Sequence, residues 1–384
     1  MNKAEVKTQR IIKALNHEEP DQVPVTDFFW SGFIKKWQKI KELDTNANIY
    51  DYYDLDLVVV NPNMDPVPNP PEIIEDSEEQ IIYKSGWGSK VMIKKENPMP
   101  GYLEHSINNK DDYDKYEFHD PADDVRYDEI RGDLINMGDS FNPEIPSLTD
   151  QIESLKNNFC LFGGVCEPNE VLTRARGQEG TFLDLAMYPE KVKKFAERST
   201  DFMIEIGKEQ LRRYECLTGM VIWGDIAYDK GMFYSPDLWR EIFKPSVARL
   251  CEELKNAKEG LKLIYHGCGD ARAVFDDLID VGIDCYNPLE VKAGLDVVEL
   301  KNKYKDKLAC HGGIDVRTLA DKTKTDVKDE IMRKLNAAKG GGYIVSSDHS
   351  VATNVKIENY DYMVKIIREN GKYPLDLGKY DETI

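Results

Sequence analysis

Eight short apolar segments constrain the fold of this chain more than any other feature of its sequence. Continuous apolar runs of this length are typical of strands that are buried on both faces. Helical patterns separate most of the runs, and strand and helix alternate four times after residue 220. This alternation predicts an α/β protein with a parallel sheet and crossover helices, and the count of eight favours a (β/α)8 TIM barrel over a doubly wound sheet. The expected strands are residues 23–28, 57–61, 159–164, 220–225, 262–267, 284–288, 307–311 and 342–347.

Proline positions predict where several helices begin. The helical pattern over 181–218 contains Pro189, which we expect to start a second helix. Ser235 followed by Pro236 is typical of an N-cap with proline in the first helical position. Pro245 divides the segment that follows. Further helices are expected at 270–280, 294–305, 325–338 and 356–370.

The stretch 62–158 interrupts the alternation of strands and helices. Within it, apolar runs at 80–84 and 90–95 flank a Gly-Trp-Gly turn at 86–88, which predicts a β-hairpin. The chain has 384 residues, whereas a bare barrel needs about 250. One domain with insertions and two domains are both compatible with that length. We interpret 1–384 as a single barrel domain with an N-terminal extension, and 62–158 as an insertion that covers the barrel mouth.

The composition argues against several classes of partner. The formal net charge is −19, whereas binding to nucleic acid or to an anionic membrane needs clustered lysine and arginine. No apolar run approaches the roughly 20 residues of a membrane span, and the charged N-terminal residues lack the apolar core of a signal peptide. Seven cysteines without a CxxC pair favour reduced thiols. We therefore expect a cytoplasmic enzyme.

Polar side chains gather at the predicted carboxyl ends of the strands, where (β/α)8 barrels carry their chemistry. Three of the six histidines follow the last strands of the chain. For any one of them, a hydrogen-bonded histidine at the start of a loop is the alternative. The strand-end residues that we single out are Glu167, Asp225, Tyr228, His266, Cys268, Glu290, His311, Asp348 and His349.

The segment His266-Gly267-Cys268 is the sharpest local pattern. Residues i and i+2 of an extended segment point to the same side, so imidazole and thiolate can meet one ion. Both are common zinc ligands. The remaining ligands must come from neighbouring strand ends, namely from Glu290, His311, Asp348 or His349. A core thiol beside a packed histidine is the alternative.

Aromatic residues follow the first predicted strand. Phe28 and Trp30 are candidates to line an apolar substrate pocket, although aromatic residues at this spacing are more often part of a core. Asp348 and His349, at the last strand end, complete the substrate-binding residues that we expect.

Five segments of the chain resemble the uroporphyrinogen decarboxylase superfamily, and the resemblance covers almost the whole chain except 62–158. The superfamily has a (β/α)8 barrel fold, which the resemblance therefore implies here. It includes the decarboxylase and zinc-dependent methyltransferases that work with corrinoid proteins. The segments are RIIKALNHEEPDQVPV, SPDLWREIFKPSVARL, YHGCGD, CHGGIDVRTLA and GGYIVSSDHSVATNVKIENY.

Two departures from the family patterns bear on the branch. The decarboxylase has an arginine-rich RQAGR segment after its first strand, whereas this chain reads DFFWSGFIKKW, without arginine. The methyltransferases share the H-x-C pair but carry a later cysteine near the last strand, where this chain has Ser346-Ser347-Asp348-His349. That departure argues against a methylcobalamin:thiol methyltransferase. The chain looks more like enzymes that demethylate methyl ethers and load a corrinoid.

The resemblance implies a zinc site and a corrinoid-dependent reaction. Zn²⁺ would be held by His266, Cys268, Glu290 and His311 and would act as a Lewis acid on a small methyl donor, such as a methyl ether. Glu167, Asp225 and Tyr228 are candidates for the acid that protonates the leaving oxygen.

The cobalt would be carried by a separate corrinoid protein that binds transiently, because this chain has no D-x-H-x-x-G segment. A homodimer is compatible with these expectations. A metal-free decarboxylase or lyase, and a non-catalytic corrinoid-binding barrel, are the alternatives.

Overall fold

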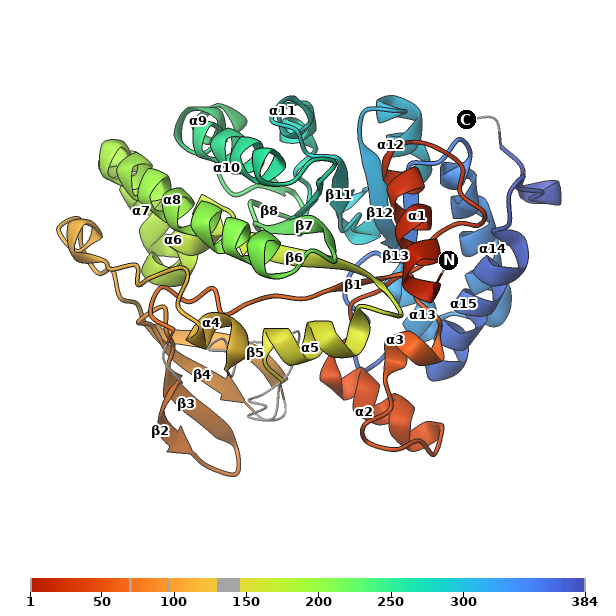
Figure 1. Ribbon diagram of the computed structural model, residues 1–384, viewed down its shortest axis with the longest axis horizontal. Helices are drawn as coiled ribbons and strands as arrows, with labels where there is room; N and C mark the ends of the chain where they lie inside the picture. Colours follow the sequence, from red (N-terminus) through yellow and green to blue (C-terminus); the bar gives the residue numbers. More distant parts are fainter. Residues whose placement is uncertain (1, 69–70, 95–96, 130–145, 383–384) are drawn as a thin grey trace.

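A curled, seven-stranded parallel sheet forms the centre of the computed structural model, which describes residues 2–68, 71–94, 97–129 and 146–382 (Figure 1). The strand order is β1-β6-β7-β10-β11-β12-β13, so each strand pairs with the next barrel strand along the chain. Right-handed crossovers through helices are the usual way to build such a sheet. The strands are β1 (Leu57–Val59), β6 (Cys160–Cys166), β7 (Leu217–Trp223), β10 (Lys262–His266), β11 (Cys285–Asn287), β12 (Ala309–Ile314) and β13 (Tyr343–Ser347).

An extended segment takes the eighth position, between β13 and β1. Val25 forms a parallel bridge with Val345, and Thr26 N donates to the Val345 carbonyl at 3.1 Å. On the other side, Asp56 N donates to the Val25 carbonyl at 2.8 Å. The strand predicted at 23–28 is therefore present only as isolated bridges. One reason is that Pro24 has no N–H to contribute to a ladder.

The barrel interior is apolar toward the amino ends of the strands. Alternate residues point inward, and those from all seven strands form one cluster with helix α1 (Lys3–Leu15). Ile11 and Leu15 of α1 pack into this cluster, so α1 covers the amino end of the barrel. The strand residues of the cluster are Leu57, Cys160, Phe162, Val221, Ile264, Cys285, Ala309 and Ile344.

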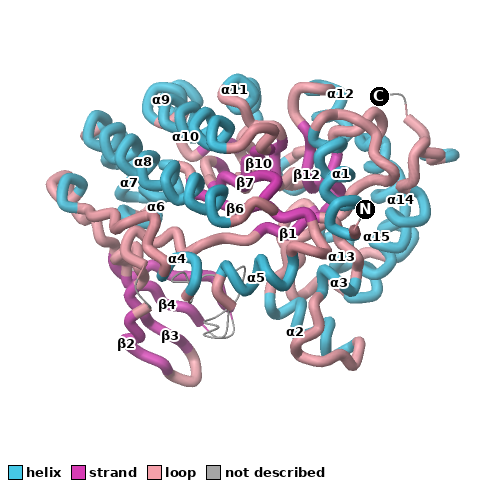
Figure 2. The backbone as a smooth tube through the Cα atoms, in the orientation of Figure 1, coloured by secondary structure: helices cyan, strands magenta, loops and turns pink. Residues whose placement is uncertain are grey.

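Helices surround the sheet, as the backbone tube makes clear (Figure 2). The expected helix starts are confirmed: α8 begins at Pro189, Ser235 caps α9 by accepting from Leu238 N, and Pro245 lies in the first turn of α10. The helices after α1 are α2 (Ser31–Ile40), α3 (Ile49–Tyr52), α4 (Val125–Asp128), α5 (Leu148–Leu155), α6 (Pro168–Arg176), α7 (Gln178–Met187), α8 (Pro189–Arg213), α9 (Pro236–Ile242), α10 (Lys244–Ala257), α11 (Phe275–Asp280), α12 (Val297–Tyr304), α13 (Val316–Asp321), α14 (Lys324–Lys334) and α15 (Ile357–Asn370).

Part of the insertion forms a separate antiparallel sheet in the order β2-β3-β4-β5. The strands are β2 (Glu72–Asp76), β3 (Gln80–Lys84), β4 (Lys90–Lys94) and β5 (Asn97–Glu104). The predicted hairpin is confirmed as β3–β4, except that residue 95 lies outside the described residues, as do 69–70, 96 and 130–145. The sheet projects from one side of the barrel (Figure 1), where Ser89 Oγ donates to the Arg174 carbonyl of α6 at 2.8 Å. Coverage of the barrel mouth stays a prediction.

A two-stranded ribbon, β8 (Ala227–Tyr228) with β9 (Gly231–Met232), follows β7.

Among the helices in the described part of the chain, we find none with the length and apolar character that a membrane crossing requires.

Candidate functional site

Four inward-facing side chains lie at one level near the carboxyl ends of adjacent strands. The register pairs His266 of β10 with Trp223 of β7 and with Asn287 of β11. Asn287 Nδ2 donates to the His311 carbonyl of β12 at 3.0 Å, which continues the level to a fourth strand. We call Trp223, His266, Asn287 and His311 the inner polar layer.

The inner polar layer follows directly from the alternation of the strands. Each of its members lies two residues after an inward-facing member of the apolar cluster: Val221, Ile264, Cys285 and Ala309. Because a strand repeats every two residues, the next inward position lies one level closer to the carboxyl ends. The barrel interior therefore changes from apolar to polar within one step.

Phe28 packs against this layer. Its ring centroid lies 5.8 Å from that of Trp223, 6.0 Å from that of His266 and 6.2 Å from that of His311. Trp223 and His266 are 4.7 Å apart, and Trp223 Nε1 donates to Asn61 Oδ1 at 2.9 Å. Phe28, predicted as a substrate-binding residue, thus lies against aromatic and hydrogen-bonding side chains.

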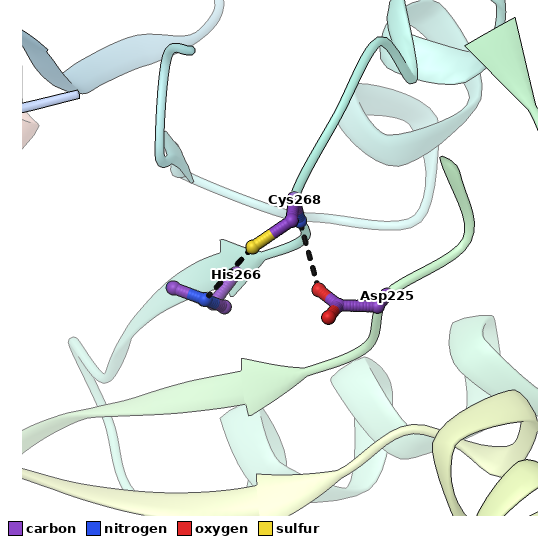
Figure 3. Close-up of side chains that lie close together, drawn as sticks. All are labelled: Asp225, His266 and Cys268. Carbon is purple, nitrogen blue, oxygen red and sulfur yellow. Dashed lines mark hydrogen bonds between the residues drawn. The ribbon is translucent and has the colours of Figure 1, made fainter. Parts of the chain in front are cut away.

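A first group of potential metal ligands lies at the strand ends and just beyond them. Side-chain atoms of Asp225, His266 and Cys268 all lie within 4.8 Å of one another (Figure 3). His266 Nε2 is 3.9 Å from Cys268 Sγ, and Cys268 N donates to Asp225 Oδ1 at 2.8 Å. The backbone at Cys268 is therefore anchored by the neighbouring strand end.

Cys268 also belongs to a second group, with Glu290 and His349, again within 4.8 Å. Glu290 Oε1 accepts from Gly269 N at 3.1 Å, and its Oε2 lies 3.0 Å from Lys292 Nζ. Among the described residues, His311 belongs to neither group. We call Asp225, His266, Cys268, Glu290 and His349 the strand-end cluster.

Burial controls the protonation of the histidines and of the thiol. It lowers the pKa of His266, against the opposing attraction of Asp225, and it lowers the pKa of His311 to about 3, with nearby His266 acting in the same direction. Burial raises the pKa of the Cys268 thiol, and the carboxylates of Asp225 and Glu290 raise it further. These shifts favour the neutral imidazoles of His266 and His311 and the protonated thiol of Cys268.

Glu167, predicted as a catalytic acid, is completely buried, and neither carboxyl oxygen has a hydrogen-bond partner among the described residues. A Cβ placed on Gly224 would lie 2.1 Å from Glu167 Cγ. Since Trp223 faces inward, Gly224 faces the outer side of β7, and Glu167 lies on that side. Burial, reinforced by the nearby Glu170, raises the pKa of Glu167 well above its ordinary value.

Three further residues that the sequence predicted for the site, Asp348, Trp30 and Tyr228, lie outside both groups of potential metal ligands among the described residues. Both oxygens of Asp348 accept backbone hydrogen bonds at 2.8 Å, from Val291 N and Val316 N, and burial raises its pKa to about 6 although these two bonds lower it. Trp30 is the N-cap residue of α2. Tyr228 is 47% exposed and stacks on Phe233.

Three residues of the site received no role from the sequence: Asn61, Trp223 and Asn287. The period of two along β7, β10 and β11 is the signal that could have found the last two, because it places them level with His266. Asn61 follows β1 and is identified only through its bond to Trp223.

Among solved structures, a methyltransferase from Methanosarcina mazei is similar to this chain at a TM-score of 0.66 and 15% identity, covering 94% of this chain and 98% of that one. Xylanase 10B from Thermotoga maritima matches at a TM-score of 0.37 and 12% identity, over 69% and 93% of the two chains. No curated protein matches the chain by sequence. The model of the uroporphyrinogen decarboxylase (URO-D) family matches residues 86–370. The chain belongs to the uroporphyrinogen decarboxylase family.

Proposed function

We propose that this protein is a zinc-dependent methyltransferase that moves a methyl group from a small methyl donor, such as a methyl ether, to the cobalt of a corrinoid protein. One observation carries the proposal: Cys268 belongs to two groups of potential metal ligands at the strand ends of a chain in this family. The structural likeness to a methyltransferase supports the fold on which such a reaction would run.

The donor atoms of the strand-end cluster fit Zn²⁺. The cluster combines one thiol, two imidazoles and two carboxylates, and zinc accepts sulfur, nitrogen and oxygen ligands together. We propose that Cys268 binds the ion, and that the other protein ligands come from His266, Glu290 and His349. When bound, the ion would supply Lewis acidity to the leaving atom of the donor.

Side chains of this protein would bind the methyl donor and protonate its leaving oxygen. Phe28 and Trp223 offer apolar faces for the methyl group and its neighbouring carbons. Asp225, exposed at the end of β7 and close to Cys268, is the best placed of the three candidate acids to protonate a leaving oxygen. Glu167 and Tyr228 have less suitable surroundings, since one lies behind Gly224 and the other packs on Phe233.

The cobalt would arrive on a second protein, because this sequence contains no D-x-H-x-x-G segment. That protein would also have to visit its methyl acceptor, so we propose a transient and partly polar encounter at the strand-end side of the barrel.

The test is to mix the protein with reduced corrinoid protein and a panel of aryl methyl ethers, methylamines and methanol, and to follow the cobalt absorption spectrum. Methylation by at least one donor, lost in Cys268→Ser, is the expected result. Failure with every donor, together with release of CO₂ from uroporphyrinogen, would assign the chain to the decarboxylase activity. If the protein only methylates a thiol from methylcobalamin, it would be a methylcobalamin:thiol methyltransferase, which moves the methyl group away from cobalt.

A further inference from the structure

In the part of the chain that the structure describes, the imidazole of His311 has no hydrogen-bond partner. Its side chain is 1% exposed, and neither Nδ1 nor Nε2 has a hydrogen-bond partner among the described residues. The backbone of the same residue is well satisfied, since the His311 carbonyl accepts from Asn287 Nδ2 at 3.0 Å. The lack of partners is therefore confined to the imidazole ring.

An unpartnered buried imidazole is costly. A neutral ring carries one donor and one acceptor, and a buried donor or acceptor without a partner destabilises the folded state. His266, at the same level, has both nitrogens engaged, one by Asn287 at 2.6 Å and the other by Cys268 at 3.9 Å. The inner polar layer thus contains one satisfied and one unsatisfied imidazole.

The surroundings of His311 separate it from the metal ligands. It belongs to neither group of ligating atoms, and it lies inside β12, three residues before that strand ends at Ile314. Cys268, Glu290 and His349, in contrast, follow the ends of their strands. His311 instead contacts the ring of Phe28, which also contacts Trp223.

We infer that His311 binds the methyl donor, with its imidazole hydrogen-bonded to a polar atom of a small, uncharged molecule whose apolar part lies against Phe28 and Trp223. This inference rests on the proposed function and deepens it. Filling the site would give His311 the partner that the chain does not provide. The donor is thereby placed between His311 and the strand-end cluster.

The charge of the surroundings sets the class of donor. The inner polar layer and its contacts Phe28 and Asn61 are all uncharged at neutral pH, so a charged group buried there would lose hydration without a counter-ion. An aryl methyl ether fits these surroundings, and a polycarboxylate does not.

Binding of methoxybenzene, measured without corrinoid, tests the inference. We expect His311→Phe, which keeps an aromatic ring but removes both nitrogens, to weaken binding at least about tenfold while zinc content stays at the wild-type level. His311→Gln, which keeps a donor and an acceptor, should recover part of the affinity. His119→Gln, at a partly exposed histidine of the insertion, is the matched control.

Four results would overturn the inference. Loss of zinc in His311→Phe would show that His311 is a metal ligand. Unchanged affinity for methoxybenzene in this variant would show that His311 has only a structural role. Tighter binding of 4-methoxybenzoate than of methoxybenzene would refute the uncharged class of donor. If the variants fail to fold, the ring ¹⁵N resonances of His311 in the wild-type protein must shift when methoxybenzene is added, and no shift refutes the contact. Binding without methyl transfer would instead refute only the proposed function.

Discussion

His266 donates its Nδ1 proton to Asn287 Oδ1 at 2.6 Å. The direction of this bond is set by the second bond of the same amide, because Asn287 Nδ2 donates to the His311 carbonyl at 3.0 Å and so turns Oδ1 toward His266. The proton on Nδ1 leaves the lone pair of Nε2 facing Cys268 Sγ, 3.9 Å away. Asn287 thereby selects the tautomer of His266 that can bind a cation.

Asn287 therefore allows a first prediction. Asn287→Ala removes the acceptor for His266 Nδ1, and we expect zinc affinity to fall roughly 10–100-fold, as is usual when the partner of a ligating histidine is lost. Asn287→Asp keeps an acceptor and should retain more of the affinity. Competition with a chromophoric chelator measures both, and equal affinity in all three proteins would show that Asn287 does not orient the ligand.

Glu290 supplies a second prediction. Glu290→Gln keeps the acceptor for Gly269 N but replaces the carboxylate by a neutral amide. We expect zinc affinity to fall at least about tenfold and methyl transfer to be lost, while the melting temperature stays within about 4 °C of the wild type. Glu299→Gln, at an exposed position of α12, is the control. A variant that keeps wild-type zinc and activity would remove Glu290 from the metal site.

Gly269 tests how closely the segment after Cys268 packs. Its φ is +80°, and a Cβ placed there would lie 2.6 Å from the backbone of Tyr228. Gly260 has a φ of +74° with nothing within 4 Å of a placed Cβ, so it isolates the conformational cost. We expect Gly260→Ala to cost about 1 kcal/mol and Gly269→Ala a further 1–3 kcal/mol or so, with weaker zinc binding only in the latter. Equal unfolding free energies in urea would contradict the close packing.

Glu167 makes the stability depend on pH. Its pKa is raised by burial in the folded state, so the folded protein binds that proton more tightly than the unfolded chain does. The free energy of unfolding therefore falls as the pH rises above the ordinary value of 4.5. Glu167→Gln should be more stable than the wild type by at least about 2 °C near pH 8, and the gain should vanish below about pH 4.

Thermal melts between these two pH values provide the measurement. Glu252→Gln, at an exposed position of α10, should show no such trend. A gain in Glu167→Gln that does not change with pH would show that burial does not raise the pKa of Glu167.

The barrel could be predicted because strands buried on both faces are continuous apolar runs, and seven of the eight appear as strands. The first could not, since Val25 makes only one isolated bridge, to Val345, and the preceding Pro24 has no N–H to donate. Strand ends were harder to place. The run at 307–311 was expected to end at His311, but β12 continues to Ile314 because Gly312, Gly313 and Ile314 also pair with β13.

That difference in strand length explains which of the candidate metal ligands could be predicted from the sequence. His266 and Cys268 could be paired because they are two residues apart on one segment. His311 was expected beside them, but it lies inside β12 and outside both groups of potential ligands. Asp225 and His349, the second of which was already a ligand candidate from the sequence, lie near Cys268. Contacts between segments that are distant in sequence depend on register and loop path, which no single-segment pattern contains.

Cobalt substitution tests the central claim, that Cys268 is a ligand of a metal ion at the strand ends. Co²⁺ is titrated into metal-stripped protein, and the charge-transfer absorption between thiolate and cobalt is recorded. We predict that this absorption saturates at one ion per chain in the wild type and in Cys216→Ser, a half-buried cysteine outside the cluster, and that it is absent in Cys268→Ser. Absence of the band in the wild type, or its persistence in Cys268→Ser, would contradict the account.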